Sequence, residues 1–270
     1  MTRFLVVPQW QGSPAPRAML LVDGAEAIAG DLPRAATTRV EVPAEAGEEL
    51  ETGIRRFSAL NRVAEAVGAA LATGDEPALV IGGDCGVALP AIAHAARTHT
   101  DLAVVWFDAH GDLHTPTTSP SGAFAGMALR AVVATSALPG GGAVAEDRTV
   151  LVGTRELDEP ERAFLDTSAV RVVDADAAAE ASALVDAVAA TGAQAVYIHV
   201  DLDVLDPAVL AGVSRPVPFG LTLAQLTAAI GAVRSRFPLA GASLSGFAPA
   251  SPAAAVDDLG TILRVVGALA

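Results

Sequence analysis

The sequence predicts an α/β protein built on a parallel sheet of eight strands with helices covering both faces. Three observations predict it. Short apolar runs rich in β-branched residues recur along the chain, segments of helical length separate most of them, and the runs are apolar throughout instead of alternating. A strand without alternation is buried on both sides. Strands that alternate with helices therefore indicate a covered parallel sheet.

The expected elements follow one another in this order. The eight runs expected as strands are residues 4–7, 38–42, 78–81, 102–107, 149–152, 170–173, 195–200 and 241–244. Amphipathic or Ala-rich segments expected as helices are residues 48–72, 87–97, 122–135, 175–190, 223–236 and 253–269, of which the first has the clearest pattern. Segments 115–121 and 207–220 are rich in Pro, Gly and Ser and are expected loops. Without a repeat or a long polar linker, residues 1–270 are expected to form a single domain.

Composition limits the class of partner. The apolar fraction of 52% is enough for a sizeable core, and the net charge of -14 disfavours a nucleic-acid partner. The single cysteine excludes a disulfide framework and fits a reducing cytoplasm. The N-terminal apolar run is too short for a signal peptide, and no run reaches the roughly 18 residues of a membrane span. We therefore expect a cytoplasmic protein that acts on a small molecule.

Acidic side chains follow the expected strands where those strands end. Asp108, His110 and Asp112 come directly after residues 102–107, and Asp201 and Asp203 follow residues 195–200. Alternate residues of an extended segment point to the same side. Carboxyl ends of parallel strands are also where ligands bind in open α/β sheets. The sequence therefore predicts that these side chains converge at one edge of the sheet.

Converging carboxylates repel one another unless cations lie among them. Oxygen ligands with one imidazole suit a hard or borderline divalent ion, Mn²⁺ before Zn²⁺, and bridging carboxylates favour two ions that activate a water molecule. Taken alone, Asp108, His110 and Asp112 are also compatible with a surface loop. The segment 201–207 taken alone is compatible with a turn capped by Asp206. Because both motifs end buried strands, a metal site is the preferred interpretation.

Three motifs carry a resemblance to a known family. GGDC at 82–85, DAHGD at 108–112 and DLDVLDP at 201–207 closely resemble the metal motifs of the arginase–agmatinase (ureohydrolase) family, and the likeness runs over nearly the whole chain. The resemblance implies a three-layer α/β/α fold around a parallel eight-stranded sheet. It also implies a binuclear manganese site that hydrolyses a guanidine-type C–N bond, and a homo-oligomer, either a trimer or a hexamer.

Carried over from the family, the ligands would be Asp108, His110, Asp112, Asp201 and Asp203. The resemblance gives Asp108 and Asp201 the bridging role, and it gives Asp112 the task of orienting the hydroxide between the ions.

The first departure from the family is Cys85, which stands where a His ligand is usual. A buried structural Cys is common, but the position of Cys85 inside the motif favours ligation. Near a dication the thiol would ionise. A soft thiolate shifts the preference of that site toward Zn²⁺, or leaves a single ion bound.

The second departure concerns substrate binding. Ala125 and Ala123 stand where many arginases have a His and an Asn, and Gly246 stands where the family usually has a Glu that holds the guanidinium. Loss of a desolvated counter-ion disfavours a strongly basic substrate by several kcal/mol. A less basic N-hydroxyguanidine, such as Nω-hydroxy-arginine, is therefore favoured over arginine. The Cys-for-His change also resembles the hydroxyarginine amidinohydrolases of D-cycloserine biosynthesis, although these keep the Glu.

Four further residues are candidates at the rim of the site. His114 is a possible proton shuttle, or a loop His without a catalytic task. Asp158 matches an acid that binds the substrate amino group in arginases, and is equally placed to cap a helix. Ser121 matches a substrate-contacting Ser, and Arg215 is the only base in the 207–220 loop.

The preferred function is therefore a binuclear metallohydrolase, an amidinohydrolase that acts on a guanidino or N-hydroxyguanidino group. One alternative is a single-metal amidohydrolase of the deacetylase or formimino type that uses Asp108, His110 and Asp201. The other is a degenerate, non-catalytic scaffold, which the changes at Ala125 and Gly246 favour and the retained ligands oppose.

Overall fold

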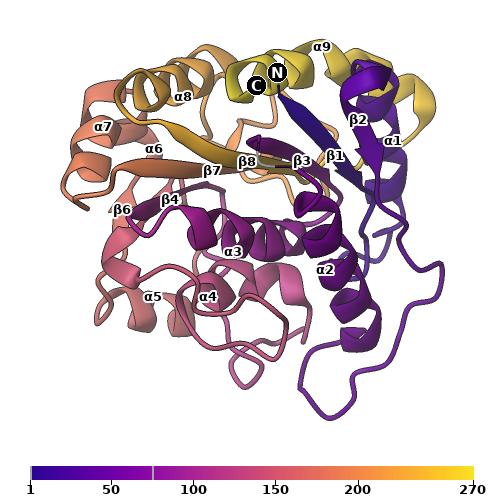
Figure 1. Cartoon of the computed structure of the whole chain (residues 1–270). Helices are drawn as coiled ribbons and strands as arrows, with labels where there is room; N and C mark the ends of the chain where they lie inside the picture. The colour runs from indigo at the N-terminus through magenta and orange to yellow at the C-terminus, as the bar shows by residue number, and fades with distance from the viewer. Residues whose placement is uncertain (1, 75) are drawn as a thin grey trace.

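The computed structural model describes residues 2–74 and 76–270, and its centre is a parallel sheet of eight strands (Figure 1). The strand order is β2-β1-β3-β8-β7-β4-β5-β6, and every neighbouring pair is parallel. The strands are β1 Arg3–Val7, β2 Thr37–Arg39, β3 Ala78–Gly82, β4 Leu102–Phe107, β5 Thr149–Val152, β6 Arg171–Val173, β7 Ala195–Asp201 and β8 Leu239–Ser245. The predicted fold class is confirmed.

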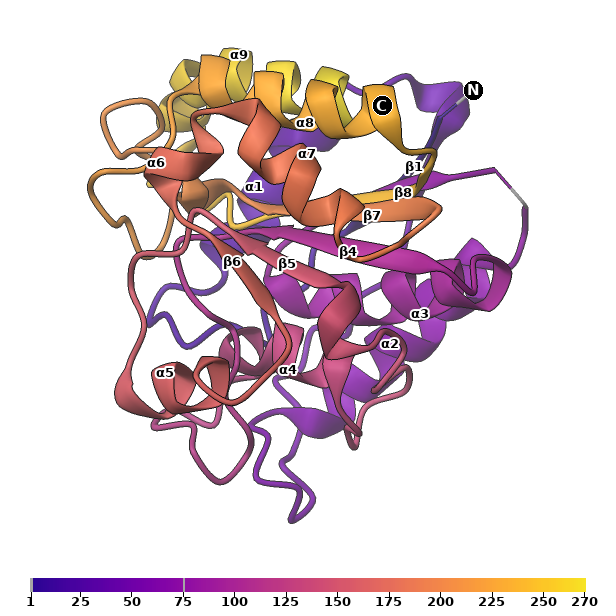
Figure 2. The ribbon, with the colours of Figure 1, turned by 90° about the vertical axis from the view of Figure 1, so that its left-hand side faces the viewer.

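Helices cover both faces of this sheet, as Figure 2 shows from the side. One face carries α1 Leu20–Gly30, α6 Ala175–Ala178, α7 Ala181–Ala189, α8 Leu223–Arg236 and α9 Pro252–Leu269. The other face carries α2 Phe57–Leu71, α3 Ala88–Thr98, α4 Ala128–Val133 and α5 Glu159–Leu165. None of the helices in the described ranges is long and apolar enough to cross a membrane.

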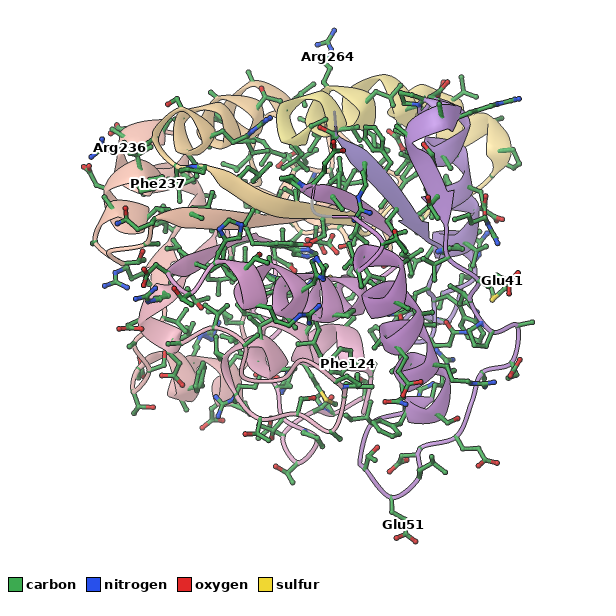
Figure 3. All side chains as sticks on the ribbon, in the orientation of Figure 1. Glu41, Glu51, Phe124, Arg236, Phe237 and Arg264 are labelled. Atoms are coloured by element: carbon green, nitrogen blue, oxygen red, sulfur yellow. The ribbon has the colours of Figure 1, made fainter. Side chains whose placement is uncertain are left out.

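Two apolar cores lie between the sheet and the helical layers. In β1, Phe4 and Val6 belong to the core under α1, α7, α8 and α9, whereas Leu5 and Val7 belong to the core under α2, α3 and α4. This division follows from the two-residue period of a strand. The central strands β4 and β7 are buried at every residue, which explains the uninterrupted apolar sequence of β4 and of residues 195–198 in β7. Side chains fill both layers, and Glu51 and Arg264 point outward into solvent (Figure 3).

Several predicted helix boundaries were wrong. The expected helix at 48–72 begins only at Phe57, because Leu50, Glu51 and Arg56 adopt left-handed backbone conformations that an α-helix excludes. The segment expected at 175–190 divides into α6 and α7, with extended backbone at Glu180 between them. The segment expected at 122–135 is a 3₁₀ turn at Phe124–Met127 followed by the short helix α4. Helices α1 and α5 were not predicted.

The expected loop 207–220 is held against the sheet by one side chain. The guanidinium of Arg155, just beyond β5, donates to the backbone carbonyls of Asp203 at 2.9 Å, Val217 at 2.7 Å and Pro218 at 3.0 Å. It also reaches carbonyls of Gly153, Val204 and Leu205. A planar guanidinium with five N–H groups suits such a cage of acceptors. Arg155 therefore ties this loop to the segment that follows β7.

We expect Arg155→Ala to lower the free energy of unfolding by about 1–3 kcal/mol, because several buried carbonyls lose their donor. Amide hydrogen exchange should accelerate within residues 207–220. The matched control is Arg148→Ala, which removes a surface ion pair with Asp101 at 3.0 Å and should cost less than about 1 kcal/mol. Equal urea midpoints for the two variants would contradict the anchoring role of Arg155.

Candidate metal centre

The four central strands deliver the polar groups of the site from their carboxyl ends. β3, β8, β7 and β4 are neighbours in the sheet. Cys85 follows β3 after a short Gly-Gly-Asp turn, Ser245 ends β8, Asp201 ends β7, and Asp108 follows β4 directly. Because the strands are in parallel register, their ends lie side by side, and the predicted convergence is what the structure contains.

Cys85, Asp201 and Asp108 form one part of the cluster, and all three side chains are buried. The thiol of Cys85 lies 2.9 Å from Oδ2 of Asp201 and 3.9 Å from Oδ2 of Asp108. Ser245 donates its hydroxyl to the same Asp201 oxygen at 3.1 Å. Trp106 donates from its indole nitrogen to Asp108 at 3.2 Å. The two carboxylates and the sulfur therefore share one small space.

His110 and Asp203 form the other part. Nδ1 of His110 lies 2.9 Å from Oδ2 of Asp203 and 3.4 Å from Oδ1 of Asp108. The backbone N–H of Ala109 donates to Asp203 at 3.1 Å, which fixes that carboxylate. Burial opposes protonation of His110, but its hydrogen bonds to Asp108 and Asp203 prevail and raise its pKa to about 11. A cation that takes this place has to displace the proton.

Asp112 lies in the same buried cluster with an unsatisfied oxygen. Its Oδ2 has no hydrogen-bond partner within the described part of the chain, and its φ of 53° is left-handed, which is rare for a non-Gly residue. The next residue, Leu113, donates its N–H to the buried carboxylate of Glu161 at 3.1 Å. Glu161 therefore holds the bend that turns Asp112 inward.

Burial and mutual repulsion raise the pKa values of these acids. Desolvation, followed by repulsion from Asp203, raises the pKa of Asp201 from 3.8 to about 7. Desolvation and the charge of Asp108 raise the pKa of Asp112 well above its ordinary value. Burial and the neighbouring carboxylates likewise raise the pKa of the Cys85 thiol. A divalent cation among these groups would reverse each effect.

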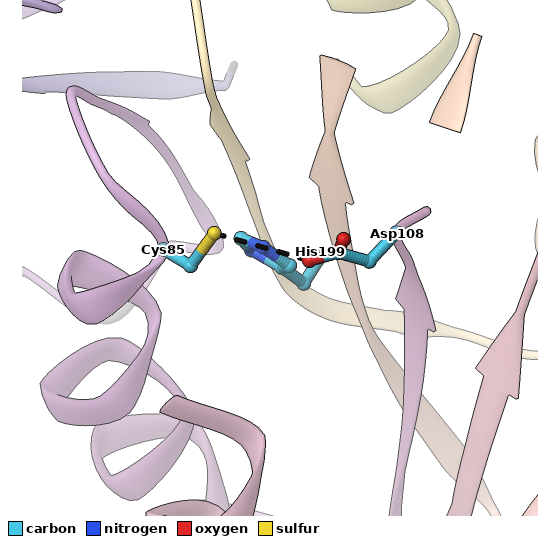
Figure 4. A group of neighbouring side chains, drawn as sticks. All are labelled: Cys85, Asp108 and His199. Carbon is cyan, nitrogen blue, oxygen red and sulfur yellow. Dashed lines mark hydrogen bonds between the residues drawn. The ribbon is translucent and has the colours of Figure 1, made fainter. Parts of the chain in front are cut away.

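The donor set fits metal ions. Asp108, His110 and Asp203 place one ligand atom each within 4.8 Å of one another, and so do Cys85, Asp108 and His199 (Figure 4). Asp108 belongs to both groups, as a bridging ligand does. Oδ2 of Asp112 is buried and has no hydrogen-bond partner in the described residues. Unsatisfied buried donors and acceptors of this kind are satisfied by coordination.

A cavity of about 320 Å³ opens above these groups. All four predicted rim residues line it, namely His114, Ser121, Asp158 and Arg215. Nε2 of His114 lies 2.9 Å from Asp158, and Arg215 lies 2.9 Å from Glu156, so two ion pairs flank the opening. Because Asp158 and Glu156 are each paired, their carboxylates are less available to bind a substrate.

Asp158 caps α5 in a reciprocal capping box with Glu161 and also lines the cavity. Its contact with a substrate amino group stays a prediction.

The positions that depart from the family also face the cavity. Ala125 and Gly246 both line it. A Cβ atom built on Gly246 would lie 2.2 Å from Oδ1 of Asp201, and the φ of Gly246 is 91°. The backbone at 246 is thus packed directly against a metal-site carboxylate. A Glu in this conformation would collide with Asp201, and the loss of a counter-ion at this position stays a prediction.

Sequence reasoning missed three participants. Ser245 donates a hydrogen bond to Asp201. Glu161 accepts one from the backbone N–H of Leu113, the residue after Asp112. Glu156 pairs with Arg215. His199 was predicted only to pack or hydrogen-bond within its strand. Its ring lies 3.8 Å from the Trp106 ring, centroid to centroid, and desolvation lowers its pKa to about 3. The signal in the sequence was that His199 lies two residues before Asp201 on the same strand, so the two side chains point to the same side.

The strand order and the cavity above the strand ends are typical of α/β proteins that bind their ligands at the carboxyl end of a parallel sheet. The Arginase family model matches residues 24–256 of this chain. The chain belongs to the arginase family, and it is a hydrolase of the ureohydrolase type, whose members cleave C–N bonds of linear amidines. The resemblance seen in the three motifs is confirmed.

Individual relatives agree with this assignment. The chain is 34% identical to the N(omega)-hydroxy-L-arginine amidinohydrolase of Streptomyces lavendulae over 72% of this chain and 69% of that protein. It is 32% identical to the arginase of Bacillus caldovelox over 72% of this chain and 67% of that protein. The structure of Entamoeba histolytica arginase in complex with L-ornithine superposes with a TM-score of 0.84 at 20% identity, covering 99% of this chain and 97% of that one. This last likeness shows the fold.

The raised pKa values predict how the metal-free protein responds to pH. In the folded chain the pKa of Asp201 is about 7 against an ordinary 3.8, so the fold favours the protonated form. The stabilisation is complete below the ordinary pKa and is lost as pH rises through about 7. After chelation, urea unfolding at about pH 8 should give a lower free energy than at about pH 5, on the order of a few kcal/mol. A flat profile would contradict the buried cluster.

Gly246→Ala should destabilise the protein and weaken metal binding, because the new Cβ collides with Asp201 and the positive φ adds about 1–2 kcal/mol. The control is Gly231→Ala in α8, where no heavy atom lies within 4 Å of the added carbon and stability should stay equal or rise slightly. Thermal melting and metal content measure both. If Gly246→Ala behaves like the control, the backbone at 246 does not constrain Asp201.

Proposed function

We propose that this protein is an amidinohydrolase that uses two divalent ions to hydrolyse a guanidino or N-hydroxyguanidino group, with an N-hydroxyguanidine preferred over arginine. The observation that carries the proposal is the buried cluster of four carboxylates, one imidazole and one thiol at the floor of an open cavity. Family membership and the hydroxyarginine amidinohydrolase among the relatives support it.

The residues that would hold the ions are Cys85, Asp108, His110, Asp112, Asp201 and Asp203. When bound, divalent ions supply Lewis acidity and lower the pKa of water so that it becomes a nucleophile near neutral pH. We propose Mn²⁺ beside His110 and Asp203, because oxygen and imidazole ligands suit it. The chain's own part is positional: hydrogen bonds from Trp106 and Ser245 fix Asp108 and Asp201, and Asp112 presents its free oxygen.

The preference for a less basic substrate rests on the charges around the cavity. Position 246 is a glycine and therefore contributes no carboxylate to the cavity. Asp158 and Glu156 are each paired with a basic side chain, His114 and Arg215 respectively. A guanidinium therefore finds no unpaired rim carboxylate among these, whereas an N-hydroxyguanidine is less basic and needs less counter-charge. The relative named as an N(omega)-hydroxy-L-arginine amidinohydrolase supports this substrate class.

We assign His114 the proton transfer at the rim. A carboxylate only accepts hydrogen bonds, so Nε2 of His114, 2.9 Å from Asp158, carries the proton. His114 borders the cavity, and Ala125 offers no alternative donor. Nδ1 of His114 faces the Thr118 hydroxyl at 3.2 Å, so a departing amine would receive the Nε2 proton by taking the place of Asp158 beside that nitrogen.

Two ions are favoured over the single-metal alternative because Asp108 belongs to two separate groups of ligand atoms. The single-metal alternative uses Asp108, His110 and Asp201, yet Asp203 lies 2.9 Å from His110 and the thiol of Cys85 lies 2.9 Å from Asp201, so one ion would leave part of this buried cluster without a cation. Such a cluster is costly without neutralisation. We also propose that the enzyme acts in the cytoplasm as a homo-oligomer.

A substrate panel tests the proposal. With added Mn²⁺, the purified chain should release hydroxyurea from Nω-hydroxy-arginine with kcat/KM at least about tenfold above that for urea release from arginine or agmatine. Asp112→Asn should lower kcat by on the order of 10²-fold, since it removes a group that orients the reacting atoms. The control is Asp186→Asn on the exposed side of α7, which should leave kcat unchanged. Absence of turnover with every guanidino, N-hydroxyguanidino and formimino compound would overturn the proposal.

A further inference from the structure

His199 is a buried imidazole with one free nitrogen. Its side chain is 0% exposed, and it sits on β7 two residues before Asp201. Nδ1 lies 2.7 Å from the hydroxyl of Ser243 on the neighbouring strand β8. Nε2 has no hydrogen-bond partner in the part of the chain that the structure describes. An unpaired polar atom in the interior of a protein is costly unless something binds it.

Figure 4 draws the ring of His199 beside the contact between the Cys85 sulfur and Asp108, which are 3.9 Å apart. A ring nitrogen of His199, the sulfur of Cys85 and a carboxylate oxygen of Asp108 all lie within 4.8 Å of one another. Oδ2 of Asp201 is 2.9 Å from the same sulfur. Four donor atoms of three chemical kinds therefore converge from β3, β4 and β7.

We propose that His199 is a metal ligand of this chain and that, with Cys85, Asp108 and Asp201, it forms a four-ligand site that prefers Zn²⁺ to Mn²⁺. Sulfur, nitrogen and two oxygens are the ligands that zinc takes in tetrahedral sites, and a thiolate discriminates against manganese. The pairing of Nδ1 with Ser243 matches the usual arrangement of a ligating imidazole, whose second nitrogen is held by a neighbouring polar group.

The site accounts for the cysteine and the histidine together. Where a thiol replaces an imidazole at position 85, a second imidazole from the adjacent region restores a nitrogen donor. The neutral ring is the form that binds metal, and on binding the thiol proton of Cys85 leaves to solvent. Asp108 would then bridge this ion to the one held by His110 and Asp203, which gives two different ions in one centre.

The inference rests on the proposed metal-dependent function, but it is tested without turnover. The purified chain is dialysed against equal concentrations of Zn²⁺ and Mn²⁺, and its metal content is measured. We expect one zinc per chain, and in the Co²⁺-substituted protein a sulfur-to-cobalt charge-transfer band with the intense visible bands of a tetrahedral site. His199→Asn should lower zinc affinity at least about tenfold, and Cys85→Ser should remove the charge-transfer band.

The matched control is His99→Asn, the same change at a partly exposed histidine before β4, at the opposite end of the strands. It should leave zinc affinity and the cobalt spectrum unchanged. If His199→Asn does not fold, a crystal structure of the unaltered zinc-loaded chain decides, with anomalous scattering identifying zinc about 2.0–2.1 Å from Nε2 of His199 and about 2.3 Å from the sulfur.

Zinc bound away from His199, no zinc uptake, or a folded His199→Asn variant with unchanged affinity would overturn the inference. A chain that binds zinc through His199 yet hydrolyses no guanidino compound would overturn the proposed function and leave this site standing.

Discussion

The desolvation of clustered carboxylates is the constraint on which the rest of this structure depends. Asp108, Asp112, Asp201 and Asp203 lie within one buried region, where their negative charges are far less stable than in water. The chain accepts this arrangement because the apolar sheet beneath it is rigid and in parallel register, so the strand ends cannot move apart. Raised pKa values and unsatisfied atoms are the outward signs of a site built for cations.

Around this cluster, the surrounding segments serve to hold individual groups in place. Glu161 stabilises the left-handed turn at Asp112 through the N–H of Leu113. Arg155 ties the loop after β7 to the end of β5. These contacts join segments that are distant in sequence, so the geometry of the site depends on the closed three-layer fold and not on any one loop.

The floor and the rim of the cavity have separate tasks. The floor carries the buried cluster of carboxylates, imidazole and thiol, and the chain belongs to a family of hydrolases that cleave amidine C–N bonds. At the rim, backbone at Gly246 packs against Asp201, and His114 pairs with Asp158. Charge at the rim governs how basic a substrate can be, because a carboxylate that is already paired is not available to bind a cationic substrate.

Strand periodicity and motif spacing are local properties, so the amino-acid pattern alone predicted the sheet, its parallel sense and the cluster at its carboxyl edge. It did not give the true start of α2 or the break between α6 and α7, where turns with unusual backbone angles override an amphipathic pattern. Only the tertiary structure decided the surroundings of His199, the hold of Glu161 on the backbone after Asp112, and the contact of Gly246 with Asp201. Each of these joins residues far apart in the chain, and such proximity exists only once the strands have paired.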